Sequence, residues 1–187
     1  MSKADPTVLV VEDEPSLVEI YAHWLREDYS VRTAQDGEEA LEQIDDTVDV
    51  IVLDRIMPKV TGDEVIEVVR DRDLDCMIVM ATAVESGQNL IEAGADAYCT
   101  KPITKNELLT AVSQMLDRGE YIDLEQKYFD LLEKRSALKA DSDAESRQSD
   151  EEYVELEARI DELSDRLEQQ TESMGDDEFI SIMRNTT

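Results

Sequence analysis

The sequence has few of the residues on which many catalytic and structural sites depend. Its 187 residues include two cysteines and one histidine, and Cys76 and Cys99 form neither a CxxC pair nor a pair with a nearby histidine. Such cysteines are expected to be buried, reduced thiols rather than a disulfide or a metal site. No apolar run reaches the roughly 18 residues of a membrane helix, and the polar start lacks the features of a signal peptide. We therefore expect a cytoplasmic protein with no membrane partner.

Basic residues are also scarce. The chain has 47 acidic and 18 basic residues, and its net charge of −29 is divided into −16 over residues 1–119 and −13 over residues 120–187. Without a basic patch, the release of counterions from DNA phosphates cannot drive binding, so direct DNA binding is not expected. Acidity along the whole chain favours a halophile protein, in which molar salt screens the self-repulsion, over an ordinary acidic cytosolic protein.

Short apolar runs alternate with amphipathic segments over the first two thirds of the chain. The runs predict five strands, at residues 8–11, 30–34, 50–53, 77–81 and 97–100, and the segments predict helices at 14–26, 37–45, 63–72, 86–93 and 105–118. This alternation is typical of an α/β fold with a doubly wound parallel sheet. Pro15 suits a first helical turn, Thr104 and Glu107 form a capping box, and Gly119 is expected to cap the last helix and end the domain.

Polar residues follow the ends of four predicted strands. They are Glu12, Asp13, Asp54, Thr82 and Lys101. Because parallel strands end at the same edge of a sheet, we expect these side chains to meet in one crevice. Three carboxylates so close together would raise one another's pKa unless a cation neutralised them, and oxygen ligands with room for water suit Mg²⁺.

These residue types fit phosphoryl chemistry. Asp54 can attack a phosphoryl donor as a carboxylate nucleophile and form an acyl phosphate. Mg²⁺ held by Asp13 and Asp54, with Glu12 acting directly or through water, would offset the charge on the reacting oxygens. The Lys101 ammonium and the Thr82 hydroxyl can each bind a further phosphoryl oxygen.

Several motifs occur in order and at suitable spacing over residues 6–118. They are VVEDEP at 10–15, LDRIMP at 53–58 with Gly62, ATA at 81–83, GADAY at 94–98 and KP at 101–102. With these motifs the chain resembles the receiver domains of two-component response regulators. The resemblance implies a flavodoxin-like sheet with strand order 2-1-3-4-5, a receiver domain over residues 1–119, and a phosphoacceptor switch rather than an enzyme.

The resemblance also implies roles for single residues. Asp54 would accept a phosphoryl group from a sensor histidine kinase, and Mg²⁺ would be bound by Glu12, Asp13, Asp54 and the backbone carbonyl of Ile56. Thr82 and Tyr98 would be the switch pair, and the peptide bond before Pro102 would be cis. One departure is Glu12, where many members have Asp. Ile56 and Val84, two residues after Asp54 and Thr82, are apolar and predict slow self-dephosphorylation.

Residues 120–187 have a different pattern. Apolar residues recur at helical spacing from Tyr121 to Leu138 and from Leu156 to Leu167, with a polar stretch between them and a capping box at Ser149 and Glu152. This pattern predicts two helices joined by a flexible loop, which pair with each other, with the receiver or with a second chain as a homodimer. The segment resembles the HalX domain of haloarchaeal receivers. A stabilising hairpin and a signalling or dimerisation role both remain open, and a short piece around Phe179 is expected to close the bundle.

Three functions are compatible with these patterns. The first is a phosphorylation-operated switch that signals through an unidentified downstream protein, because no helix-turn-helix or glycine-rich nucleotide loop follows Gly119. The second is a degenerate receiver that acts as a constitutive binding module. The third is a Mg²⁺-dependent phosphatase with Asp54 as nucleophile, which is disfavoured because Ile56 occupies the position where haloacid-dehalogenase-like phosphatases place an acid.

Overall fold

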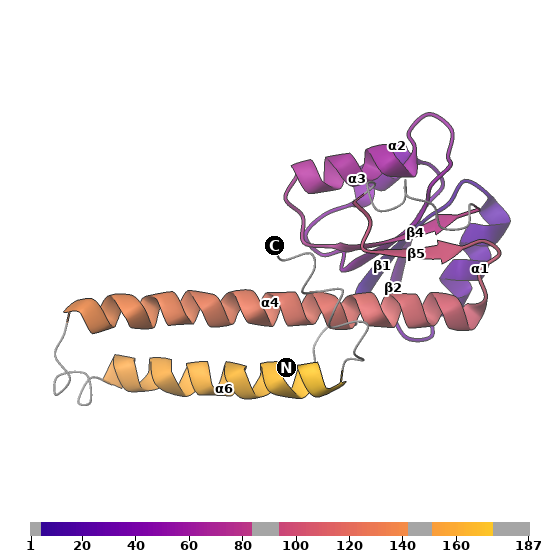
Figure 1. The fold of residues 1–187 in the computed structure, drawn as a ribbon. Coiled ribbons are helices and arrows are strands. Elements are labelled where there is room, and N and C mark those ends of the chain that lie inside the picture. Colours follow the sequence, from indigo (N-terminus) through magenta and orange to yellow (C-terminus); the bar gives the residue numbers. More distant parts are fainter. Residues whose placement is uncertain (1–4, 84–93, 142–150, 174–187) are drawn as a thin grey trace. The chain divides into compact units, whose positions relative to one another are not determined.

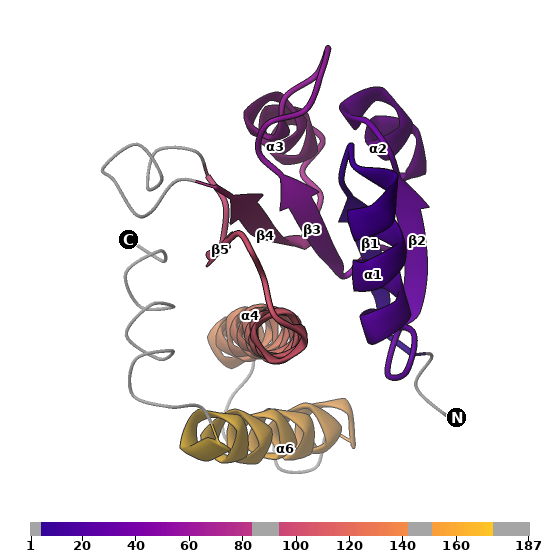
Figure 2. The same cartoon turned by 90° about the vertical axis from the view of Figure 1, so that its right-hand side faces the viewer.

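The computed structural model describes residues 5–83, 94–141 and 151–173, and Figures 1 and 2 show it from two sides. The chain divides into two units, Met1–Gly119 and Glu120–Thr187. In the described ranges, every helix is too short or too polar to cross a membrane.

The first unit is built on a parallel sheet of five strands. They are β1 (Thr7–Val11), β2 (Ser30–Ala34), β3 (Val50–Asp54), β4 (Met77–Thr82) and β5 (Ala97–Thr100), and they lie in the order β2-β1-β3-β4-β5. β3 and β4 are buried along their whole length, which explains their nearly continuous runs of apolar residues. The predicted strands and the predicted order of the sheet are confirmed.

Helices cover both faces of this sheet (Figure 2). They are α1 (Pro15–Leu25), α2 (Gly37–Gln43), α3 (Gly62–Asp71) and the first turns of α4 (Lys105–Asp141). α2 and α3 pack into one core cluster, and α1 and the start of α4 pack into the other. Pro15 stands in the first turn of α1, and Thr104 and Glu107 form the predicted capping box before α4. The helix predicted at residues 86–93 lies outside the described residues.

Gly119 ends the first unit, but it does not cap a helix as predicted. It was expected to cap a helix that ends at residue 118, but α4 continues through it to Asp141. A glycine inside a helix costs only about 1 kcal/mol relative to alanine, and the strong helix formers after it outweigh this cost. The prediction of a separate helix from Tyr121 is therefore also wrong, because these residues extend α4.

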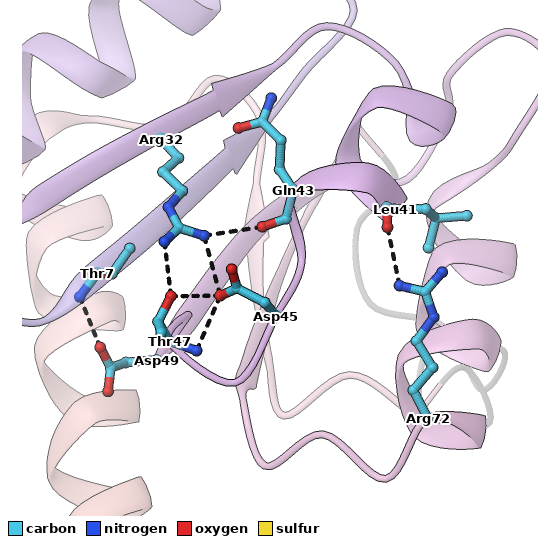
Figure 3. A network of polar contacts seen from close by, with 8 residues as sticks. All are labelled: Thr7, Arg32, Leu41, Gln43, Asp45, Thr47, Asp49 and Arg72. Atoms are coloured by element: carbon cyan, nitrogen blue, oxygen red, sulfur yellow. Dashed lines mark hydrogen bonds and ion pairs between the residues drawn. The ribbon is translucent and has the colours of Figure 1, made fainter.

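The short helix α2 ends with two of its carbonyl groups bound by arginines from neighbouring elements (Figure 3). Arg32 of β2 donates to Gln43 O at 3.0 Å and to Thr47 Oγ1 at 2.7 Å. Arg72, at the end of α3, donates to Leu41 O at 2.9 Å. Helix C-terminal carbonyls lack partners within the helix and attract cations, so these contacts anchor a helix with no basic residue in its own last turn.

The second unit pairs the later part of α4 with α6 (Glu151–Ser173). Tyr121 of α4 packs against Leu167 of α6, and Arg135 Nη1 lies 3.4 Å from Glu157 Oε2. The higher numbers of one helix thus meet the lower numbers of the other, so the helices run antiparallel (Figure 1). Their most buried apolar side chains are Tyr121, Leu124, Ile160 and Leu163. Ser149 and the segment around Phe179 lie outside the described residues.

Candidate functional site

The strand register brings the predicted site residues to one edge of the sheet. Val11 pairs with Leu53 and Asp54 pairs with Ala81, so the acids that end β1 and β3 are neighbours. Thr82 pairs with Thr100, which places Lys101 just beyond the same edge. The Lys101 N–H donates to Thr82 O at 2.8 Å and extends this pairing by one residue.

Three carboxylates converge there. Glu12 and Asp54 are buried, with 2% and 6% of their surface exposed, and Asp13 is exposed. One oxygen from each of the three lies within 4.8 Å of the others. Oxygen ligands at this spacing, with one side open to water, suit a hard divalent cation such as Mg²⁺. The residues present therefore fit the implied metal.

A single ammonium group balances part of this charge. Lys101 Nζ lies 2.6 Å from Glu12 Oε2 and 3.1 Å from Asp54 Oδ1. The first contact is an ion pair by distance, but Glu12 Oε2 is buried and makes no hydrogen bond of good geometry. Burial raises the pKa of Glu12, and the nearby Asp54 charge adds to the effect while Lys101 opposes it. Burial alone would lower the pKa of Lys101, but its bonds to Glu12 and Asp54 outweigh burial and raise it.

The predicted switch residues lie on β4 and β5. Thr82 is 2% exposed at the end of β4, beside the acids. Tyr98 is half-buried on β5, where its ring packs against the core that α2 and α3 cover, and burial raises the pKa of its phenol. The two positions are thus on neighbouring strands, and Tyr98 is not part of the carboxylate cluster. Val84 lies outside the described residues.

The loop between β3 and α3 completes the edge. Ile56, whose carbonyl is the fourth expected metal ligand, has 67% of its surface exposed, and its N–H donates to Asp54 Oδ1 at 3.4 Å. The Lys101–Pro102 peptide bond is cis, as the resemblance implies.

Four residues that hold this loop were not predicted from the sequence: Arg55, Thr61, Asp63 and Glu64. Arg55 Nε lies 3.2 Å from Asp63 Oδ2. Gly62, which is part of the sequence motif, lies where an added Cβ would be 2.5 Å from Asp54 O. Thr61 and Glu64 form a capping box at the start of α3. The box has the S/T-x-x-E spacing and could have been found from the sequence. The ion pair gives no such signal.

With this geometry established, comparison with known proteins identifies the family. Residues 8–113 match the model of the response regulator receiver domain, and residues 117–183 match that of the HalX domain. The chain belongs to the response regulator receiver domain family. Its receiver domain has the flavodoxin-like fold of two-component systems, and a HalX domain follows it.

Named relatives agree with this assignment. A candidate transcriptional regulator of Haloferax volcanii is 44% identical over 136 residues, which are 72% of this chain and 23% of that protein. The alkaline phosphatase synthesis transcriptional regulatory protein PhoP of Bacillus subtilis is 41% identical over 118 residues, which are 60% of this chain and 49% of PhoP. The matched region thus spans 23% of the first relative and 49% of the second. The haloarchaeal relative agrees with the acidic composition.

Solved structures show the same fold. The chemotaxis protein CheY4 of Vibrio cholerae is similar over 60% of this chain and 100% of its own, with 33% identity and a TM-score of 0.56. DrrB of Thermotoga maritima, an OmpR/PhoB homologue, is similar over 61% of this chain and 54% of its own, with 26% identity and a TM-score of 0.57. Both similarities cover about the length of the receiver domain.

Proposed function

We propose that this response regulator is a Mg²⁺-dependent phosphorylation switch in which Asp54 accepts a phosphoryl group from a sensor histidine kinase. The observation that carries the proposal is the convergence of Glu12, Asp13 and Asp54 within 4.8 Å of one another, beside Lys101. Like charges held this close, two of them buried, destabilise a protein unless a ligand neutralises them, and these groups suit a metal ion and a phosphoryl group.

The proposed reaction is one group transfer. An oxygen of Asp54 attacks the phosphorus atom of phosphohistidine, the new O–P bond forms as the P–N bond breaks, and the electron pair stays with the departing imidazole. Lys101 Nζ lies 3.1 Å from Asp54 Oδ1, so it is close enough to bind an oxygen of the phosphoryl group attached to Asp54. The Thr82 hydroxyl binds another oxygen and links the modified site to Tyr98.

Glu12, Asp13, Asp54 and the Ile56 carbonyl are the proposed ligands of Mg²⁺. The bound ion would neutralise charge on the nucleophile and the phosphoryl oxygens. The buried carboxylates of Glu12 and Asp54 support this assignment because they share the Lys101 ammonium, and a bound cation would compensate the negative charge that remains.

Phosphorylation by acetyl phosphate tests the switch. The protein is incubated with MgCl₂ and acetyl phosphate in molar KCl, and intact mass is measured. We expect the mass of one phosphoryl group in the wild type and none in Asp54→Asn. Asp49→Asn is the matched control, because Asp49 precedes the same strand and bonds to Thr7 N instead of the site. Phosphorylation of Asp54→Asn, or steady hydrolysis of acetyl phosphate by the wild type, would contradict the proposal.

We further propose that the helical unit transmits the signal to a protein partner. Phe129 of α4 and Val154 of α6 have 53% and 54% of their surfaces exposed, so apolar surface remains after the two helices pair. Relatives named as transcriptional regulators suggest a link to transcription, but the chain's negative charge favours a protein rather than DNA as the direct partner. Light scattering with and without acetyl phosphate tests whether that partner is a second copy: a mass increase confined to the phosphorylated wild type would support dimerisation.

A further inference from the structure

The loop between β3 and α3 is closed at its base by one residue, Arg55. Its carbonyl accepts a hydrogen bond from the Gly62 N–H at 3.0 Å, and its side-chain Nε lies 3.2 Å from Asp63 Oδ2. Its own N–H donates to Ala81 O at 3.0 Å, which ties the base to β4. Main chain and side chain of Arg55 thus both bind the start of α3.

The space at this base is filled. A Cβ on Gly62 would lie 2.5 Å from Asp54 O and 2.9 Å from Arg55 Cα, so the start of α3 rests directly on the backbone of the proposed phosphoacceptor. A shift of α3 at this point would move Asp54, Arg55 and the adjoining Ile56 together.

Asp63 depends on Arg55 for its charge balance. The side chains of Arg55 and Asp63 are 22% and 41% exposed, and the Oδ1 atom of Asp63 is buried without a hydrogen-bond partner in the part of the chain that the structure describes. Arg55 is the charged partner that holds the half-exposed Asp63 carboxylate toward the loop, and water can solvate that carboxylate when the partner is lost. Without Arg55, Asp63 would therefore be expected to turn toward solvent and release the base of the loop.

We propose that the Arg55–Asp63 ion pair positions the metal-binding loop, so that the Ile56 carbonyl is held where Mg²⁺ can reach it together with the three carboxylates. The inference rests on the proposed Mg²⁺ site. Arg55 and Asp63 bind no metal in this account, and they are positioning residues that act through the backbone of the loop.

The sign of the effect separates positioning from simple electrostatics. Removing a cation near a dication site should strengthen Mg²⁺ binding if charge alone matters, and removing an acid should weaken it. If the pair positions the loop, both removals weaken binding. The double variant is then no weaker than the single variants, because the two residues act as one unit.

The experiment is calorimetric titration of the full chain with MgCl₂ in molar KCl, where long-range charge effects are screened. The variants are Arg55→Met, Asp63→Asn, their combination, and Arg55→Lys, which keeps the charge. We expect the dissociation constant for Mg²⁺ to rise about tenfold in each single variant and in the double variant. This is the lower end of the usual loss of affinity when a residue that supports a metal ligand is replaced. Arg55→Lys should recover part of the loss.

Lys59→Gln is the matched control. Lys59 is a cation of the same loop but is paired on its exposed side with Asp36 and Glu38, at 3.4 and 3.0 Å. Its loss should leave Mg²⁺ affinity unchanged or slightly higher. Circular dichroism of each metal-free variant establishes that it is folded. If Arg55→Met does not fold, Asp63→Asn, which keeps the size of the side chain, provides the test.

Asp13→Asn separates the two proposals. If Asp13→Asn weakens Mg²⁺ binding and Arg55→Met does not, the positioning role is overturned and the metal site stands. If wild type and Asp13→Asn bind Mg²⁺ equally, the metal site fails and the positioning role fails with it. Tighter binding by Arg55→Met would assign its effect to charge alone and overturn the proposal.

Discussion

The carboxylates at the two ends of the parallel sheet differ in their bonding partners. At the amino end, Asp49 accepts from the Thr7 N–H at 2.7 Å (Figure 3), and Asp96 accepts from the Ile78 N–H at 2.8 Å. Asp96 also pairs with Arg70 Nη2 at 2.7 Å. At the carboxyl end, three carboxylates lie close together, and two of them share the Lys101 ammonium.

This difference separates stability from function. The acids of the amino end complete the hydrogen bonding of strands that would otherwise leave N–H groups unsatisfied, so they stabilise the fold. The acids of the carboxyl end repel one another and destabilise the metal-free protein. Their negative charge remains available to bind a ligand. Substitutions at the two ends should therefore have opposite effects on stability.

The largest effect is expected from Gly62→Ala. The new Cβ would lie 2.5 Å from Asp54 O, a backbone atom that cannot turn away. The substitution should lower the free energy of unfolding by about 3 kcal/mol, the upper end for overpacking. Thermal unfolding by circular dichroism measures it.

Gly119→Ala is the control, since its added Cβ would meet only the Met77 side chain at an ordinary 3.6 Å. Alanine there should stabilise the α4 helix by about 0.5–1 kcal/mol. Equal effects of the two substitutions would contradict the close approach at Gly62.

Asp96→Ala tests the amino end. It leaves the buried Ile78 N–H without its acceptor and Arg70 without its carboxylate, so it should destabilise the protein by about 2–3 kcal/mol. Asp49→Ala should cost less, about 1 kcal/mol, because Thr7 at the start of β1 is only partly buried and water can replace the acceptor. Chemical denaturation of both variants gives the comparison, and an equal cost would show that burial of the N–H does not decide it.

Ile56 is predicted to preserve the phosphorylated state. An apolar side chain, 67% exposed beside Asp54, offers no group to orient an attacking water. We expect the label on Asp54 to outlast a chase of several minutes, and Ile56→Glu to shorten its lifetime about tenfold, a modest general-base effect. Loss of label from the wild type within the first minutes would refute the prediction.

Much of this architecture could be read from the sequence because local signals agree with the fold. The apolar runs predicted every strand end to within one residue. The rule that parallel strands end together predicted that Glu12, Asp54 and Lys101 would meet. Pro15 and the Thr104 capping box mark the starts of helices through contacts within one helical turn, so they can be recognised from the sequence.

The failures have physical causes as well. Gly119 is compatible with both a helix end and a helix interior, and the choice depends on neighbours that continue α4. The partner of Arg55 is eight residues away and depends on the path of a loop, so spacing cannot reveal it. The arginines that bind the end of α2 come from other elements for the same reason (Figure 3).

Glu12→Gln tests the carboxyl end directly. Burial and the charge of Asp54 disfavour ionised Glu12, which the raised pKa expresses. Removing that charge should therefore stabilise the metal-free protein by about 1 kcal/mol, or several degrees in Tm, although Lys101 loses a partner. The measurement is thermal unfolding in EDTA, repeated with MgCl₂, which should stabilise the variant less than the wild type. A lower Tm in EDTA would mean that the ion pair outweighs the repulsion.

The smallest effect concerns Cys76, which precedes β4 at the amino end and is 3% exposed. Burial raises the pKa of its thiol from 9.0 to about 11. Below pH 9 the thiol is protonated in both states, and between pH 9 and about 11 only the unfolded chain loses the proton, so stability falls as pH rises through this window. By pH 9.5 the free energy of unfolding should have fallen by about 0.8 kcal/mol, and Cys76→Ala should not show this loss. Denaturation of wild type and Cys76→Ala at pH 8 and pH 9.5 isolates the effect of the thiol, because every other titrating group is common to the two proteins. If their stabilities fall equally with pH, water reaches the sulfur.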